Sequence, residues 1–182
     1  MKQEMACFSR MILMGSLLLS LCGCISSNGR KSFAPAISNF NLERYMGTWY
    51  EIARLPQWFE RNLDEVKAEY TLLENGTVKV VNTGVSNGNI QKKEGVARLK
   101  YLKSFGDLEV SFFPPFYGDY RVIRVADDYR YAVVTSKTKD ALWILSRTPQ
   151  MSRKDLDDLL AFAASYDYDV SKLEYPRQPE KP

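Results

Sequence analysis

Apolar and polar side chains alternate along most of the chain from residue 47 to residue 147, in short runs separated by turn signals. Alternation with a period of two is typical of strands that bury one face, and eight such runs are present. Short turns join consecutive runs, so the pattern predicts an antiparallel meander, folded either as an up-and-down barrel or as a sandwich. The predicted strands cover residues 47–54, 65–73, 77–85, 91–101, 107–113, 119–126, 129–136 and 141–147.

Glycines punctuate this meander at three places. Asn75-Gly76 lies between the second and third runs, and it favours a two-residue type I′ turn because both positions of such a turn need a positive φ. The sequence Asn87-Gly88-Asn89 marks the next hairpin. Gly95 lies inside the fourth run and predicts a bulge or a bend in that strand.

One long helical pattern follows the last strand, over residues 148–166. Ser152 is its predicted N-cap, and Asp155 stands three residues later, where it completes a near capping box. A short helical turn is also predicted after Asn41, and a short final strand over residues 168–175. The apolar face of the long helix, which we expect to pack on the outside of the barrel, consists of Leu156, Leu159, Leu160 and Ala163.

The first residues have the pattern of a secretory signal: basic Lys2 and Arg10, a short apolar run, and small residues. The sequence LCGC at 21–24 resembles a bacterial lipobox, which implies a signal peptide over 1–23 and lipid attachment at Cys24. An ordinary cleaved signal is the alternative. All three cysteines lie in this leader, which suits an anchor and not disulfides. Ile25 replaces the aspartate of inner-membrane lipoproteins, which implies the outer membrane. Residues 24–38 are predicted to be a flexible tether, and 180–182 a disordered tail, with disorder expected from Pro176 onward.

Composition excludes several functions. The net charge of +3 is too small to indicate nucleic-acid binding, so no nucleic-acid partner is predicted. The chain has no histidine, which removes Ser-His and Cys-His nucleophiles and histidine-ligated metals. No phosphate-binding or dinucleotide motif is present. We therefore predict neither an enzyme nor a cofactor nor a metal.

Three motifs in order resemble those of the lipocalin family, and the likeness extends over residues 39–179. They are Gly47-Thr48-Trp49 ahead of the first strand, Asp128-Tyr129 ahead of the seventh, and Arg147 at the end of the eighth. Asp127 departs from the family, which often has threonine there. The lipoprotein leader and the sequences around these motifs look like those of bacterial lipocalins. The resemblance implies an all-β, eight-stranded up-and-down antiparallel barrel with one C-terminal helix outside, and Arg147 lying across Trp49.

Strand counting assigns the loops to two ends of the barrel. Each turn reverses direction, so all three motifs meet at one end, where we expect Gly47, Trp49, Asp128, Tyr129 and Arg147 to form a structural base. The opposite end collects loops that carry four aromatic residues. These either pack on one another to cover the rim or form an apolar entrance for a lipid or a membrane: Trp58, Phe59, Phe116 and Tyr117.

Period-two parity predicts which side chains line the interior. Taking Trp49 and Arg147 as inward places Glu51 and Ala53 on the first strand, and Trp143 and Leu145 on the eighth, inside the barrel. Ala132 and Val134 match inward positions of the family. Parity in the fifth and sixth strands is ambiguous, because Phe113 and Ile123 favour the opposite assignment. The predicted cavity wall is Glu51, Ala53, Val110, Phe112, Ala132, Val134, Trp143 and Leu145. Glu51 would need a partner or a raised pKa, and would hold either a ligand head group or a structural hydrogen bond.

The resemblance implies a membrane-anchored lipocalin that binds or transports a fatty acid or a lysophospholipid in the cell envelope. Its expected location is the periplasmic side of the outer membrane, through lipidated Cys24, and a homodimer is left open. The alternative is a structural or assembly lipoprotein whose barrel is filled by side chains. A carrier of a pigment or a haem-like ring is a third interpretation, which needs a wide cavity.

Overall fold

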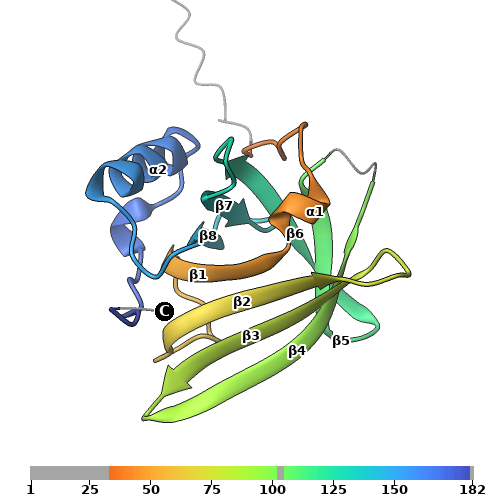
Figure 1. The fold of residues 1–182 in the computed structure, drawn as a ribbon. Coiled ribbons are helices and arrows are strands. Elements are labelled where there is room, and N and C mark those ends of the chain that lie inside the picture. Colours follow the sequence, from red (N-terminus) through yellow and green to blue (C-terminus); the bar gives the residue numbers. More distant parts are fainter. Residues whose placement is uncertain (1–32, 102–104, 181–182) are drawn as a thin grey trace, which may run out of the picture. The chain divides into compact units, whose positions relative to one another are not determined.

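A computed structural model describes residues 33–101 and 105–180. The eight strands pair in sequence order and close into an antiparallel barrel, which confirms the predicted fold class (Figure 1). The elements are α1 (Leu42–Tyr45), β1 (Gly47–Arg54), β2 (Asp64–Leu72), β3 (Val78–Ser86), β4 (Asn89–Leu99), β5 (Asp107–Phe113), β6 (Phe116–Val125), β7 (Tyr131–Thr135), β8 (Leu142–Ser146), α2 (Arg153–Ser165) and the 3₁₀ helix η1 (Val170–Lys172).

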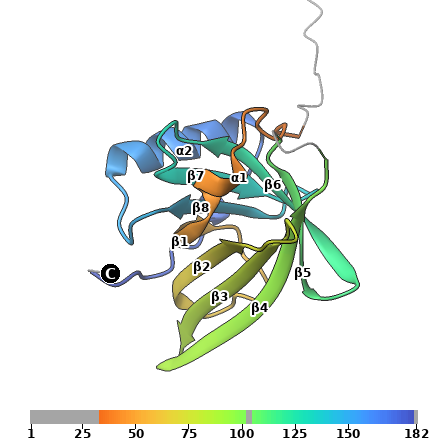
Figure 2. The same cartoon turned by 45° about the vertical axis from the view of Figure 1, so that its right-hand side comes forward.

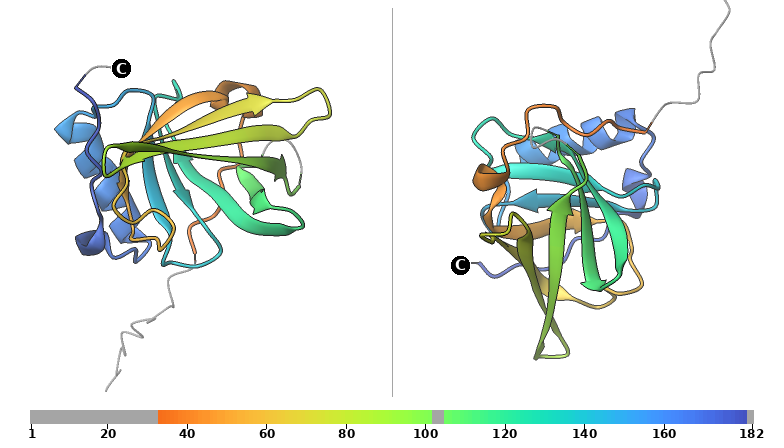
Figure 3. Two further views of the ribbon diagram at one scale, coloured as in Figure 1. Left: turned by 90° about the horizontal axis from the view of Figure 1, so that it is seen from below. Right: turned by 90° about the vertical axis from the view of Figure 1, so that its right-hand side faces the viewer.

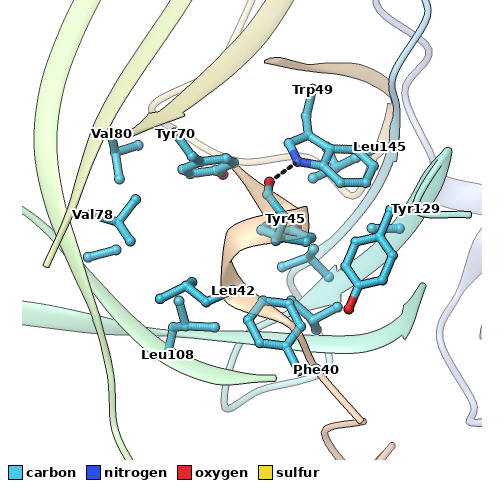
Figure 4. Close-up of a cluster of buried hydrophobic side chains, with 14 residues drawn as sticks. Phe40, Leu42, Tyr45, Trp49, Tyr70, Val78, Val80, Leu108, Tyr129 and Leu145 are labelled. Atoms are coloured by element: carbon cyan, nitrogen blue, oxygen red, sulfur yellow. Dashed lines mark hydrogen bonds between the residues drawn. The ribbon is translucent and has the colours of Figure 1, made fainter. Parts of the chain in front are cut away.

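The two ends of the barrel differ, as strand counting predicts. The β3–β4 and β5–β6 turns project from one end, away from α1 (Figure 2). The short helix α1 lies at the other end, capped by Asn41, whose side chain accepts a hydrogen bond from the Arg44 backbone N–H. Residues from α1 and from β1 to β8 form one interior cluster there, so the base is plugged by side chains (Figure 4).

The type I′ turn is found at the second asparagine–glycine pair and not at the first. Asn87 and Gly88 both have positive φ, 52° and 75°, as a type I′ turn requires. At the predicted place only Gly76 has positive φ, and the Leu73 N–H donates to the Thr77 carbonyl across a longer loop. The prediction for Asn75-Gly76 was therefore wrong in turn type, because a loop with a single left-handed glycine satisfies the same sequence.

Helix α2 packs outside the barrel, beside β7 and β8, as predicted (Figure 3). Ser152 is its N-cap and accepts a hydrogen bond from the Asp155 N–H. Leu159 and Ala163 are fully buried in a second cluster between the helix and the outer face of the sheet. This cluster covers strand positions with the parity opposite to that of the interior, including Val133 and Ile144.

The tether prediction extends too far into the chain. Residues 33–38, its described part, pack on the barrel: Ala34 is fully buried in the second cluster. The Ile37 N–H donates to the Val122 carbonyl, and the Ile37 carbonyl accepts from the Gly106 N–H. Small and proline-containing residues allow such an extended, packed segment as readily as a free one. The predicted signal peptide, Cys24 and the rest of the tether lie outside the described residues.

The C-terminal segment is also ordered, contrary to the prediction for residues from Pro176 onward. Instead of a full strand at 168–175 there is η1 and one bridge between Arg54 and Glu174. Beyond it, Arg177 forms an ion pair with Asp64, and the Gln178 side-chain amide donates to the Glu51 and Val66 carbonyls, each at 2.8 Å. These bonds hold the segment across β1 and β2, where backbone pairing between them has ended at Tyr50 and Lys67. Residues 181–182 lie outside the described part.

Candidate functional site: the barrel cavity and its two ends

The base of the barrel is built around Trp49 and Arg147. Trp49 is fully buried, and its indole N–H donates to the Tyr45 carbonyl at 2.8 Å, which ties β1 to α1. The Arg147 guanidinium carbon lies 3.9 Å from the centre of the indole, a cation–π contact. Gly47 has φ +93°, and a Cβ there would lie 3.4 Å from Arg147 Nη1. A positive φ next to this guanidinium explains why the position is glycine.

The other two predicted base residues lie in the β6–β7 turn. Tyr129 adopts a left-handed backbone with φ 61°, and its hydroxyl accepts from the Asn41 N–H at 2.8 Å. The Arg44 guanidinium lies 4.3 Å from the centre of the Tyr129 ring. Asp128 stays exposed and accepts from the Arg130 N–H, so it shapes the turn and does not touch Trp49. The five base residues are thus brought to one end in structural roles.

A cavity of about 120 Å³ lies inside the barrel above this base. Trp49, Tyr70 and Leu145, which are labelled among the interior side chains in Figure 4, contribute to its lining. The wall is mostly apolar, with a few polar groups among the aliphatic and aromatic ones. Its residues are Trp49, Glu51, Phe59, Glu60, Val66, Lys67, Ala68, Tyr70, Val80, Asn82, Val110, Phe112, Asp119, Tyr120, Trp143 and Leu145.

Most of the predicted wall residues do face the interior. Five line the cavity: Glu51, Val110, Phe112, Trp143 and Leu145. The inward parity of Val110 and Phe112 thereby settles the ambiguity in the fifth strand.

Two further predicted wall residues face the interior without reaching the cavity. Ala132 and Val134 belong to the packed interior cluster and do not border the open space. Their inward parity was right, but their side chains are already covered by neighbours.

The prediction that Ala53 lines the cavity was wrong. It is fully buried, but in the outer cluster under α2 and not in the cavity. The pairing of β1 with β8 shifts register between Glu51 and Ala53, the mark of a bulge. One extra residue reverses the faces of every later side chain on the strand, so parity counted from Trp49 fails beyond Glu51.

Several wall residues escaped the sequence analysis because the second and third strands were not assigned a parity. Alternation in β2 brings Val66, Ala68 and Tyr70 inward, and β3 adds Val80 and Asn82. The pairing of Tyr70 with Val80 and of Ala68 with Asn82 follows from the hairpin between them. Extending the period-two count across this hairpin would have found them.

Three tyrosines converge at the inner end of the cavity. The Tyr120 hydroxyl lies 2.7 Å from that of Tyr45 and 3.1 Å from that of Tyr70. Burial raises the pKa of all three, that of Tyr70 to about 12. The hydroxyls therefore remain neutral over the physiological range and satisfy one another.

A buried charge network occupies the wall near the β1–β2 loop. Arg54 donates to the Glu51 carboxylate at 2.6 Å, to the Glu60 carbonyl at 2.8 Å and to the Glu174 carboxylate at 3.1 Å. Burial, followed by repulsion from Glu60, raises the pKa of Glu51 to about 8 against the attraction of Arg54. Burial likewise raises the pKa of Glu60, whose carboxylate accepts from the Trp143 indole N–H at 3.1 Å. The structural hydrogen bond expected for Glu51 is present, and Glu51 is also one of the residues that line the cavity.

The four aromatic residues predicted at the mouth are divided between the surface and the cavity. Trp58 and Phe116 are each 79 % exposed. Phe59 packs edge-on against Trp58, with ring centres 5.6 Å apart, and lines the cavity. Tyr117 lies under the Arg98 guanidinium, 4.3 Å from it. Only part of this set therefore covers the rim, and the largest ring, Trp58, faces outward.

Among residues 33–101 and 105–180, no group of three or more cysteine, histidine or acidic side chains is placed to hold a metal ion. Within the same part of the chain, no helix is long and apolar enough to span a bilayer.

The chain was compared with known proteins. Residues 40–178 match the model of a family described as a lipocalin-like domain. The outer membrane lipoprotein Blc of Escherichia coli strain K12 is 44% identical over 145 residues, covering 79% of this chain and 82% of that protein. The protein of the same name from Vibrio cholerae is 38% identical, covering 92% and 96%. Insecticyanin from the tobacco hornworm Manduca sexta has a similar structure, with a TM-score of 0.64 and 26% identity, covering 82% and 86%.

Proposed function

Because the chain belongs to the lipocalin family, we propose that it binds one single-chain lipid, a fatty acid or a lysophospholipid, inside its barrel. The observation that carries this proposal is the mostly apolar cavity of about 120 Å³ with isolated polar groups on its wall. Apolar walls with a few placed polar groups are typical of sites for small molecules. The proposed role is binding or transport and not catalysis.

The size of the cavity favours a narrow ligand. Pockets for drug-sized molecules usually enclose about 300–1,000 Å³, whereas a cavity of about 150 Å³ lined by apolar side chains accommodates benzene. A space of about 120 Å³ is too small for two chains or a wide ring, and a single acyl chain would place only part of its length in it. Each methylene that leaves water contributes about 0.8 kcal/mol. A pigment or haem-like ring is accordingly disfavoured.

We further propose that the protein acts at the outer membrane, held on its periplasmic side by a lipid on Cys24. The support is the name of its bacterial relatives, outer membrane lipoproteins, together with the lipobox-like sequence at 21–24. Trp58 and Phe116, exposed at the mouth end, suit contact with lipid.

Native mass spectrometry of the full chain, extracted gently from membranes, tests the proposal. We expect a bound lipid, and uptake of a fluorescent fatty acid by protein stripped of it. Ala68→Phe should abolish uptake by filling the cavity, whereas Ala164→Phe, the same change at an exposed position of α2, should not. Absence of bound lipid together with absence of uptake would overturn the proposal and favour a structural lipoprotein with a filled barrel.

A further inference from the structure

The polar groups on the cavity wall are rich in hydrogen-bond acceptors. Glu51 and Glu60 line the cavity although they are only 4% and 8% exposed. Asn82 also lines it, and its side-chain oxygen is buried without a hydrogen-bond partner. A buried acceptor that lacks a donor is costly, so such a wall favours a ligand that brings donors.

The protein's own cations do not balance these acceptors. Arg54 contacts both Glu51 and Glu60, but its N–H groups already have acceptors. They donate to the Glu51 carboxylate, the Glu60 carbonyl and the Glu174 carboxylate. Two carboxyl groups, those of Glu51 and Glu174, thus share one guanidinium, and the Glu60 carboxyl has no ion pair with it. Among the described wall residues the one cation is Lys67, whose ammonium lies 3.6 Å from the Glu69 carboxylate.

We propose that the wall formed by Glu51 and Glu60 receives a cationic, hydrogen-bond-donating head group, a primary ammonium, carried by the single-chain lipid. This inference rests on the proposed function, because it names the head group of the same ligand. A primary ammonium supplies three hydrogen-bond donors and one positive charge. These are the partners that the two glutamates lack on the protein side. The aromatic faces of Phe59 and Trp143, which line the same cavity, suit a cation as well.

A free carboxylate is a poor match for the same wall. It would bring a third acid beside Glu51 and Glu60, with Lys67 as its available cation. The charged groups near Glu51 are Arg54 on β1, Glu60 on the β1–β2 loop, Lys67 on β2, Asp119 on β6 and Glu174 after η1. Asp119 is itself paired with Lys100. Since burial and Glu60 raise the pKa of Glu51 to about 8, an ammonium ligand should bind more tightly as the pH rises from about 6 to about 8.5.

Calorimetric titration of the full chain with three dodecyl compounds tests the inference. Dodecylammonium, dodecanol and dodecanoate share one chain and differ in head group. At pH 8.5 we expect dodecylammonium to bind about tenfold or more tighter than dodecanoate, the value of one hydrogen bond to a charged group. Dodecanol should fall between them.

Glu60→Gln is the more specific test, because it removes the side-chain charge while the Glu60 backbone carbonyl still accepts from Arg54. It should reduce the preference for dodecylammonium severalfold and leave dodecanol unchanged, and Glu51→Gln should also remove most of the pH dependence. Glu74→Gln, an exposed position in the β2–β3 turn, is the matched control. If dodecanoate binds as tightly as dodecylammonium, or if Glu60→Gln behaves like Glu74→Gln, the inference is overturned while lipid binding stands. If none of the three compounds binds in these titrations, lipid binding fails.

Discussion

Arg147 joins three separate segments at the base of the barrel. Its guanidinium donates to the carbonyls of Thr48, Arg44 and Tyr129, at 2.9, 2.7 and 3.3 Å, while its face covers Trp49. The planar fork of arginine suits several acceptors at once, which a lysine ammonium on a flexible stem does not. The contact therefore fixes α1 and the β6–β7 turn against β1, and closes the end of the barrel opposite the mouth.

Trp49→Ala should destabilise the fold strongly. The substitution removes a fully buried indole and its hydrogen bond to Tyr45, and losses of this kind cost about 3–5 kcal/mol. Trp49→Phe, which keeps a ring under Arg147, should cost less. Urea unfolding of the wild-type protein and of the two variants measures both losses of stability. A loss below about 1 kcal/mol for Trp49→Ala would contradict a structural role.

Glu51 makes the stability of the ligand-free protein depend on pH. Its pKa is raised to about 8 in the folded state, above the value of about 4.3 in an unfolded chain. Between these values the folded protein holds a proton that the unfolded chain has lost, so the stabilising contribution is complete below about pH 4 and is lost as the pH rises toward 8. Glu60 shifts in the same direction.

We expect the melting temperature of the ligand-free protein to fall between pH 5 and pH 8.5, and Glu51→Gln to flatten this decline. Carboxyl groups with a lowered pKa, such as Asp64 and Asp155, change the stability at pH values below this range. Differential scanning calorimetry across the range is the measurement. A melting temperature that rises with pH in the wild-type protein, or an equal slope in Glu51→Gln, would contradict the assignment.

At the scale of the element, two strands show what a sequence pattern can and cannot predict. The bounds of β1 and β5 coincide with the predicted strands at 47–54 and 107–113, because Gly47 and Asp107 mark where they begin and prolines follow closely where they end. The bulge after Glu51 has no such mark, since Ile52 and Ala53 continue the alternation. It is fixed by the pairing with β8 and by the apolar face of α2, both distant in sequence. Ala53 was therefore assigned to the wrong face.

Gly95 illustrates the same limit. The sequence predicted a bulge or a bend there, and the bulge is absent, because β4 pairs with β3 in unbroken register through Gly95. A Cβ there would instead lie 2.6 Å from the Ser111 carbonyl oxygen and 2.8 Å from Phe112 Cδ1. The glycine permits close approach of β5, and through Phe112 it shapes the cavity wall.

Gly95→Ala should destabilise the protein by about 1–3 kcal/mol through overpacking and weaken lipid uptake by displacing Phe112. Gly118→Ala is the matched control: on β6, at the other edge of β5, its Cβ would have an ordinary contact of 3.9 Å with the Val110 carbonyl. Chemical denaturation and a fluorescent fatty-acid titration of both variants make the comparison. Equal effects of the two substitutions would contradict the close-approach explanation.

At the scale of the whole molecule, the strand topology could be predicted from the sequence more completely than the packing of the segments on either side of the barrel. Short turns between alternating runs allow each strand to pair only with its neighbours, and the three motifs then fall at one end. Lipocalin resemblance selected the barrel over the sandwich. The segments on either side of the barrel were less predictable, because Ala34 and Gln178 owe their order to groups on the barrel wall and not to local propensity.

The wall of the cavity was predictable only where a strand had a fixed reference. Trp49 and Arg147 supplied one for β1 and β8, which gave Glu51, Trp143 and Leu145. The charge network around Arg54 had no sequence signal, since Glu60 comes from a loop and Glu174 from the C-terminal segment. Glu51, Glu60 and Glu174 come close together only because the chain folds into a closed barrel.

The central claim is that one acyl chain enters this cavity. A crystal structure of the protein with dodecanol brominated at its terminal carbon tests it directly, because the neutral head group makes the result independent of the charge network. We predict an anomalous bromine peak inside the barrel, among Val80, Phe112 and Leu145. A bromine peak only on the outer surface, with side chains filling the barrel, would contradict the account.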